Sequence, residues 1–356
     1  MIPECKWQPI KRLFRTGGIL AILISVIFTG RLHAQMRDTI TLPDFSYKYQ
    51  APEPYHWKRI GTFHNRVMFG NSLFEMDSVL YSFGGFDTVF TQRELNVVDG
   101  SKLRPDYSFH YPGRGFFYNI CWAQDSFLFL GGGHDSSKSF YAEQDFWKYN
   151  WSSQRWTRLK DLPFYYSFQP CIFNYKDQVF ACIPVMSGPG FRFNTPTLYH
   201  YDLPSDTWLF ICKGITLPTS GNANFLAFIL GDNLYTQNIA FKDAAFTTQF
   251  YRCNLENFTW TRMADIPGSG RDADFALSDG RYAYVGSGGT STAYYTKQVF
   301  RYDPFKDLWE EIHSLPHFLR RAQGWCFKGK YYVGFGINDR YGTYGIWQLI
   351  QDEKED

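Results

Sequence analysis

The sequence predicts an all-β fold, a six-bladed β-propeller whose ring is closed by a strand from its N-terminal side. The first observation is a set of four tryptophans separated by 52, 52 and 49 residues: Trp156, Trp208, Trp260 and Trp309. The second is an Asp or Asn six positions before each of them: Asn150, Asp202, Asn254 and Asp303. A fixed period near fifty residues indicates one supersecondary unit repeated along the chain.

A second pattern raises the number of units to six. It is an apolar run that ends in paired glycines in three copies and is weaker in the other three: 80–85, 127–132, 284–289, 179–182, 234–237 and 331–334. Paired glycines at a strand end suit a place where neighbouring backbones come close. Each unit is therefore expected to contain this strand at a fixed place.

Four short strands are expected in each unit. A further apolar run and a turn, such as Lys176-Asp177, precede the glycine strand and predict a hairpin. The Asp or Asn that ends the third strand can accept hydrogen bonds from N–H groups of the next turn. The Trp of the fourth strand is expected to bury its indole against the next blade. In the first unit Tyr107 stands where a Trp is expected.

The last unit lacks its fourth strand, because the sequence ends soon after the apolar run 346–350. The segment 55–61, which contains Trp57, has the pattern of an outer strand and directly precedes the first unit. We expect this segment to complete the last blade, which would remove an open sheet edge.

These residues resemble the kelch repeat, in which a strand ending in Gly-Gly is followed by a Tyr-Asp-like strand end and then by Trp. The resemblance covers about residues 55–351, and the chain is similar to exported kelch proteins of the N-acetylneuraminate epimerase type and to the central domain of galactose oxidases. It implies the fold more than the function, because kelch propellers include scaffolds, sugar oxidases and sugar isomerases.

The first 34 residues predict a secretory signal peptide. Basic residues precede an apolar run at 18–30, and the small Ala34 precedes the expected cleavage site. A run of about 13 residues is shorter than the ~20 that span a bilayer as a helix. We therefore expect a secreted or periplasmic protein without membrane attachment after cleavage.

The expected organisation has four parts: a signal peptide at 1–34, an extended segment at 35–54, the propeller at 55–351 and a charged tail at 352–356. Loss of the leader changes the formal net charge from +2 to −2. A mature chain of that charge has no overall basic character with which to bind nucleic acid.

Six cysteines follow the leader, and two of them allow two interpretations. Cys171 and Cys182 face one another if Lys176-Asp177 is a two-residue turn, which would permit a hairpin disulfide. The alternative is that cysteine serves as a small apolar residue in a crowded inner strand. We favour free thiols, because directly opposed cysteines on one hairpin often give a strained disulfide.

The candidate binding surface is the loop face, formed by the loops between blades and the loops after the glycine strands. Arg271 and Arg321 occupy matching positions at the openings of two adjacent blades, and two arginines there can bind a carboxylate bidentately. Alternatively they pair with loop carboxylates such as Asp272. The candidate ligand-binding residues are Arg271, Arg321, Asp272, His317, Asp339, Arg340, Arg114 and His134.

The sequence assigns no catalytic residue, metal or cofactor. His64, His134 and His317 lie on the loop face, and imidazoles can hold a transition metal, but no ligand spacing supports such a site. Tyr199-His200 belongs to a repeat strand rather than to a copper centre. The acids expected on this face are aspartates, with no glutamate in these loops: Asp87, Asp135, Asp272 and Asp339.

Two functions remain open on the sequence alone. The first is a binding module that takes a glycan, an acidic sugar or a protein on the loop face. The second is a carbohydrate isomerase or mutarotase, which would need a general acid and base beside an arginine that binds a carboxylate. We favour the binding module, because no complete set of catalytic residues can be assembled.

Overall fold

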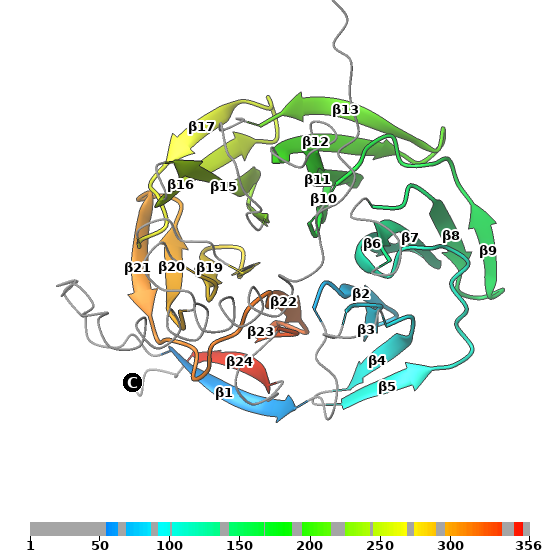
Figure 1. Ribbon diagram of the computed structural model, residues 1–356, viewed down its shortest axis with the longest axis horizontal. Coiled ribbons are helices and arrows are strands. Elements are labelled where there is room, and N and C mark those ends of the chain that lie inside the picture. The colour runs from blue at the N-terminus through cyan, green and yellow to red at the C-terminus, as the bar shows by residue number, and fades with distance from the viewer. Residues whose placement is uncertain are drawn as a thin grey trace, which may run out of the picture. The chain divides into compact units, whose positions relative to one another are not determined.

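A computed structural model describes the following residues: 55–62, 69–86, 92–99, 102–135, 142–166, 168–186, 194–214, 225–242, 245–268, 274–289, 296–336 and 345–351. They form six antiparallel four-stranded sheets arranged in a ring, without any helix in these ranges (Figure 1). The predicted six-bladed β-propeller is confirmed. Within the same ranges, no helix has the length and apolar character needed to cross a membrane.

The blades follow one another around the ring in chain order. Blade 1 contains β2 (Ser72–Met76), β3 (Val79–Phe83), β4 (Leu95–Asp99) and β5 (Lys102–Asp106). Blade 2 contains β6 (Phe117–Gln124), β7 (Phe127–His134), β8 (Phe146–Asn150) and β9 (Arg155–Arg158). Blade 3 contains β10 (Cys171–Tyr175), β11 (Gln178–Met186), β12 (Asn194–Asp202) and β13 (Thr207–Lys213).

The second half of the ring repeats this order. Blade 4 contains β14 (Leu226–Leu230), β15 (Asn233–Lys242), β16 (Ala245–Asn254) and β17 (Trp260–Met263). Blade 5 contains β18 (Phe275–Ser278), β19 (Ala283–Gly286), β20 (Val299–Asp303) and β21 (Leu308–Ile312). Blade 6 contains β22 (Gln323–Phe327), β23 (Lys330–Gly334), β24 (Gly345–Gln351) and, from the other end of the sequence, β1 (Tyr55–Thr62).

Closure of the ring by β1 is confirmed. This strand pairs antiparallel with β24, and Trp57 lies opposite Leu349. Both side chains are buried in the cluster between blades 5 and 6. The indole Nε1 of Trp57 also donates a hydrogen bond of 2.8 Å to the carbonyl of His313, just beyond the outer strand of blade 5.

The predicted turn chemistry is also confirmed. Asn150, Asn254 and Asp303 each accept a hydrogen bond at Oδ1 from a backbone N–H of the following turn, at 2.8, 2.9 and 3.0 Å. In the first hairpin of blade 3, Lys176 and Asp177 have φ of 49° and 61°, which is typical of a two-residue type I′ turn. This turn places the two cysteines of that hairpin opposite each other, as expected.

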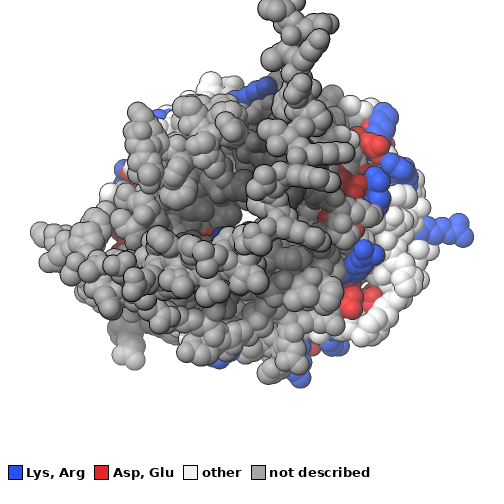
Figure 2. Space-filling view, in the orientation of Figure 1, with Lys and Arg blue, Asp and Glu red and all other residues white. Residues whose placement is uncertain are grey.

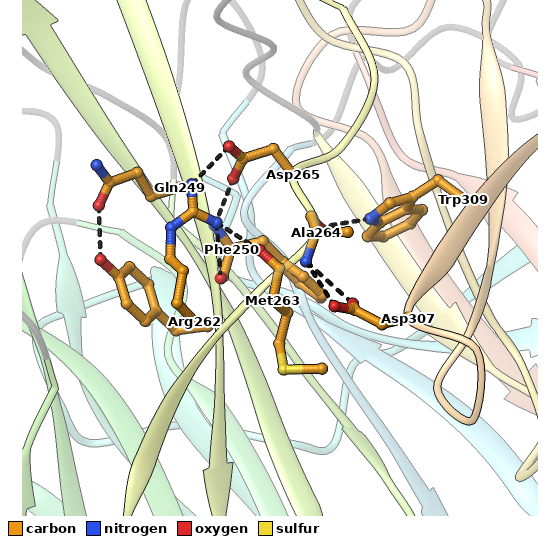
Figure 3. Close-up of polar contacts among 9 residues, drawn as sticks. Gln249, Phe250, Arg262, Met263, Ala264, Asp265, Asp307 and Trp309 are labelled. Atoms are coloured by element: carbon orange, nitrogen blue, oxygen red, sulfur yellow. Dashed lines mark hydrogen bonds and ion pairs between the residues drawn. The ribbon is translucent and has the colours of Figure 1, made fainter.

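The tryptophans of the outer strands pack against the preceding blade, so the expectation that they bury against the next one is wrong. Trp309 of blade 5 donates from Nε1 to the carbonyl of Ala264 in blade 4, at 2.8 Å (Figure 3). Asp307 accepts from the backbone N–H of Ala264, at 3.0 and 3.1 Å. Trp309 pairs with Tyr302, and directly opposed residues share one face of a sheet, here the face towards blade 4.

Blade 1 departs from the pattern more than the sequence suggests. Tyr107, at the position expected for Trp, follows β5 and is 76% exposed, so it does not take the role of the indole. Only two residues separate β4 from β5, and this places Leu103 opposite Val98, the position that Trp156 holds opposite Tyr149 in blade 2. Leu103 packs in the cluster between blades 6 and 1, whereas the buried Phe109 lies with its ring 5.3 Å from that of Trp156 in the next blade.

The paired glycines lie where adjacent blades come into contact. A Cβ built on Gly84 would lie 1.9 Å from the carbonyl oxygen of Phe116, which belongs to the segment leading into blade 2. Its φ of 65° is also in the left-handed region. Any other residue here would push two blades apart, which confirms the close approach inferred from the Gly-Gly pattern.

Candidate ligand-binding site

The site begins with the innermost strands of the six blades, which surround the ring axis (Figure 1). They are β2, β6, β10, β14, β18 and β22, and each begins at the same end of the ring because the blades are repeats. Residues just before these strands therefore gather around the axis on the loop face. In Figure 2, the described basic and acidic residues at the edge of the view are interspersed. They form no continuous basic or acidic patch there.

Three equivalent positions on this face have a left-handed backbone. Gly70, Tyr118 and Arg321 each lie seven residues before the first turn residue of their hairpin, and their φ values are 67°, 59° and 55°. Glycine adopts this conformation freely, whereas a larger residue is strained by about 1–3 kcal/mol. Retention of Tyr and Arg at such positions is typical of sites where the side chain has a function.

Arg321 joins blade 6 to blade 1. Its guanidinium carbon lies 4.5 Å from the ring centroid of Phe69, a buried residue that precedes β2. The ring of Phe69 in turn contacts those of Phe86 at 5.3 Å and Tyr118 at 6.4 Å. When a guanidinium stacks on an aromatic ring, its N–H groups point outward in the guanidinium plane and can still bind a ligand. The ring fixes the orientation of that plane.

Tyr118 connects this group to blade 5. Burial is the main cause that raises the pKa of its hydroxyl, Arg321 and Arg320 lower it, and Asp274 raises it further. Asp274 lies just before β18, so the structure brings together groups from blades 2, 5 and 6. A phenol, two guanidiniums and a carboxylate thus interact around the ring axis.

His134 ends β7 and forms the blade 2 side of the site. Its side chain is 4% exposed, and its ring lies 5.2 Å from Phe117, 6.1 Å from Tyr118 and 6.0 Å from Tyr166. Burial lowers the pKa of His134 to about 4, so the imidazole is neutral at physiological pH. Its Nε2 has no hydrogen-bond partner among the described residues.

This buried imidazole predicts a pH dependence of stability. The folded pKa of about 4 lies below the ordinary value of 6.5, so the unfolded chain binds the extra proton between these two values. Stability is therefore complete above pH 6.5 and decreases as the pH falls to 4, by about 3 kcal/mol for this group. Urea unfolding at several pH values should give a steeper loss for the native protein than for His134→Phe. Equal slopes between pH 6.5 and 4 would contradict the prediction.

Carboxamide side chains form the inner wall below these residues. Gln323 donates to the carbonyl of Asn71 in the next blade, at 2.6 Å, and Gln169 donates to the carbonyl of Asn119 in the preceding blade, at 3.1 Å. Asn119 donates to the carbonyls of Gly115 and Gly132. A carbonyl oxygen can only accept a hydrogen bond, so the group facing it must be the NH₂ of the side-chain amide. These bonds therefore determine how each amide is oriented.

Three of the side-chain amide oxygens, unlike the NH₂ groups, have no hydrogen-bond partner within the described ranges. Oδ1 of Asn71, Oδ1 of Asn119 and Oε1 of Gln169 are buried without a hydrogen-bond partner in the described part of the chain. Buried polar atoms are nearly always satisfied by protein, water or ligand. These three acceptors are covered by protein, so they belong to the packed interior of the wall and not to its surface.

A chain of ring contacts links two of the predicted residues, Arg321 and His134: Arg321 lies over Phe69, Phe69 contacts Tyr118, and Tyr118 contacts His134. Arg114 lies elsewhere: its Nη2 is 3.0 Å from Glu143 and its Nε is 3.9 Å from Asp145. The presence of Glu143 in a post-glycine loop corrects the expectation that these loops hold no glutamate.

His317 is exposed, with its ring 5.6 Å from that of Trp347 on β24, and it shares no ring contact with His134. Asp135 is buried and lies 3.6 Å from Arg93. No group of three His, Cys, Asp or Glu in the described ranges could hold a metal ion. The other predicted positions lie outside the described residues: His64, Asp87, Arg271, Asp272, Asp339 and Arg340.

Sequence reasoning missed Tyr118, Asp274 and the carboxamides. Tyr118 would have been found by counting back from each hairpin turn, because that count aligns it with Arg321 and Gly70. The same count places Gln169 at the offset of Tyr118 and Arg321, and it places Asn71 and Asn119 at one shared offset, six residues before their turns.

Comparison with known proteins adds no identity to this geometry. No model of a known protein family matches the chain, and no curated protein is significantly similar to it in sequence.

Proposed function

We propose that this protein is an exported kelch-repeat propeller that binds a carbohydrate bearing a carboxylate on its loop face, around Arg321. The observation that carries the proposal is the strained, left-handed Arg321 stacked on Phe69 beside the equally strained Tyr118. A carboxylate is the natural partner of a guanidinium whose plane is held in place. Tyr118 also offers a phenol beside it.

The surroundings favour a sugar as the ligand. The ring of Tyr118 lies 5.3 Å from that of Phe117 and 6.5 Å from that of Phe168, and such aromatic faces suit the apolar side of a sugar ring.

The kelch assignment and the location rest on the sequence. Paired glycines, the Asp or Asn at the third strand and the outer Trp recur in kelch order in this propeller. Residues 1–34 have the order of a secretory signal, which favours a secreted or periplasmic protein. A formal charge of −2 after cleavage argues against nucleic acid as the partner.

Substitution of Arg321 tests the binding proposal. Arg321→Gly should weaken binding of an acidic sugar such as N-acetylneuraminate or galacturonate by roughly ten- to a hundredfold, because a bidentate Arg–carboxylate contact contributes about 1.5–3 kcal/mol. Glycine relieves the left-handed strain, so the melting temperature should not fall. Isothermal titration calorimetry and thermal unfolding measure the two effects. Arg271→Ala, at the matching predicted position, should weaken binding in the same direction.

Arg281→Ala is the matched control. Arg281 also stacks on an aromatic ring, with its guanidinium carbon 4.9 Å from the ring of Tyr282, but it lies beside the hairpin turn at the opposite end of the inner strand. This variant should bind as the native protein does. Unchanged binding in Arg321→Gly, or binding of a protein partner but of no sugar, would contradict the proposal.

A mutarotase is the second candidate, favoured by the neighbourhood of Tyr118. The charges of Arg321, Asp274 and Arg320 all act on the pKa of this phenol, so a carboxylate and two guanidiniums influence one candidate acid or base. NMR saturation transfer between the anomers of N-acetylneuraminate measures the exchange directly. Acceleration by the native protein that Tyr118→Phe abolishes, without loss of binding, would favour the enzyme over the binding module.

A further inference from the structure

Four of the six cysteines in the described residues lie in one apolar cluster between blades 3 and 4. They are Cys171, Cys182, Cys212 and Cys253, and none of them is disulfide-bonded. The four cysteines lie on β10, β11, β13 and β16, the strands of blades 3 and 4 that surround this cluster. None of the four belongs to the site around Arg321. The chemistry of these thiols is therefore independent of the proposed function.

Two of these thiols meet across the seam. Cys212 is half-buried on β13, the outer strand of blade 3, whereas Cys253 is fully buried on β16 of blade 4. The two thiols interact with each other, and Cys253 Sγ donates a hydrogen bond of 3.7 Å to the backbone carbonyl of Asn254. Cys253 pairs with Trp260 on β17, so the outer tryptophan of blade 4 flanks the same contact.

The surroundings make the two sulfurs chemically unequal. The interaction with Cys253 lowers the pKa of Cys212 to about 7, and burial opposes this effect. The pKa of Cys253 is raised, first by its interaction with Cys212 and then by burial. Cys212 is thus the more accessible and the more readily ionised of the pair, and Cys253 keeps its proton.

The other thiols lack this combination. Burial raises the pKa of Cys171 to about 12 and that of Cys182 well above its ordinary value, although the two lie directly opposite each other on one hairpin. Cys326 is exposed, yet its pKa is also raised, mainly by desolvation. A reactive cysteine needs both access and thiolate character, with a second cysteine nearby to resolve it.

We propose that Cys212 and Cys253 form a redox-active pair, which a peroxide converts into a disulfide between blades 3 and 4. The Cys212 thiolate attacks one peroxide oxygen, the O–O bond breaks, and the leaving hydroxide takes a proton to become water. The product is a sulfenic acid at Cys212. The Cys253 sulfur then attacks the Cys212 sulfur, the S–OH bond breaks, and the proton of Cys253 leaves with the hydroxide as a second water.

The resulting bond joins an outer strand to the neighbouring sheet. Because β13 is the edge of blade 3, it packs against blade 4 through side chains, and the two thiols belong to this packing. A covalent link at this point restricts the unfolded chain and should raise the melting temperature by several degrees. Reduction reverses the link, so the seam between these blades responds to the redox state.

Peptide mapping after treatment with hydrogen peroxide tests the proposal. The purified protein should lose about 2 Da and give one cross-linked peptide that contains Cys212 and Cys253, with the other thiols still alkylated. Cys212→Ala and Cys253→Ala should each abolish the cross-link. Cys171→Ala and Cys326→Ala, the matched controls, should retain it. A cross-link between Cys171 and Cys182, or none in folded protein, would overturn the proposal.

Alkylation without oxidant provides an independent measurement. At pH 7 a thiol with a pKa of about 7 is about half ionised, and one with a pKa above 9 is ionised to about 1% or less. The lower nucleophilicity of the weaker base offsets part of this advantage. Iodoacetamide should still modify Cys212 several-fold faster than the more exposed Cys326. Faster modification of Cys326 would contradict the inferred thiolate, even in a variant that folds normally.

Discussion

Deletion of residues 35–61 should abolish cooperative folding. The truncated chain loses β1 up to its last residue, so β24 becomes an open edge and the cluster between blades 5 and 6 loses Trp57. Removal of a buried Trp alone costs about 3–5 kcal/mol, and the lost strand pairing adds to this. Since a domain is stable by only about 5–15 kcal/mol, the ring should not survive.

Circular dichroism during thermal unfolding measures this result. Deletion of residues 35–54 is the matched control, because it removes most of the same sequence but leaves β1 in place. Addition of a synthetic peptide with the sequence of 55–62 should partly restore the transition in the truncated chain. A truncated protein that melts within a few degrees of the control would show that β1 does not hold the ring.

Substitution Trp309→Ala should reduce the free energy of unfolding by about 4–6 kcal/mol. The indole is buried against Phe250 of blade 4, with the ring centroids 5.1 Å apart, and donates to the carbonyl of Ala264. The loss of a large aromatic side chain contributes about 3–5 kcal/mol, and the loss of the hydrogen bond about 1 kcal/mol. Urea denaturation of the variant measures the change directly.

Two phenylalanine variants separate the packing from the hydrogen bond. Trp309→Phe keeps an aromatic ring but removes the donor to Ala264, whereas Trp208→Phe removes an indole N–H that has no partner in the described residues. The first variant should therefore be less stable than the second by about 1 kcal/mol. An equal loss in both would mean that the hydrogen bond between blades contributes nothing measurable.

The architecture was predictable because its signals are local and repeated. The period of the tryptophans, the glycine pairs and the missing last strand are each readable within about fifty residues, and each unit confirms the others. The direction of the Trp packing was not predictable in this way. It depends on which face of the sheet Tyr302 and Trp309 share, and that face follows from the arrangement of one blade against another.

The candidate site was predictable only in part. Arg321 and His134 were identified from their places in the repeat, and the rings of Phe69 and Tyr118 lie between them in the structure. Their electrostatic neighbour Asp274 comes from another blade, and contacts around the ring axis leave no trace in the spacing of the sequence.

The pairing of Tyr55 with Gln351 has a consequence for how the chain can be rearranged. The two ends of the propeller leave the same sheet edge side by side, so a short glycine-rich linker could join them. New termini could then be opened at an exposed hairpin such as the one at Gly280, where an added Cβ would meet nothing within 4 Å. In such a circular permutant all four strands of blade 6 would be contiguous, and the seam would move to blade 5. Blade 6 would then be made in one piece, before blade 1, instead of from the first and last segments of the chain.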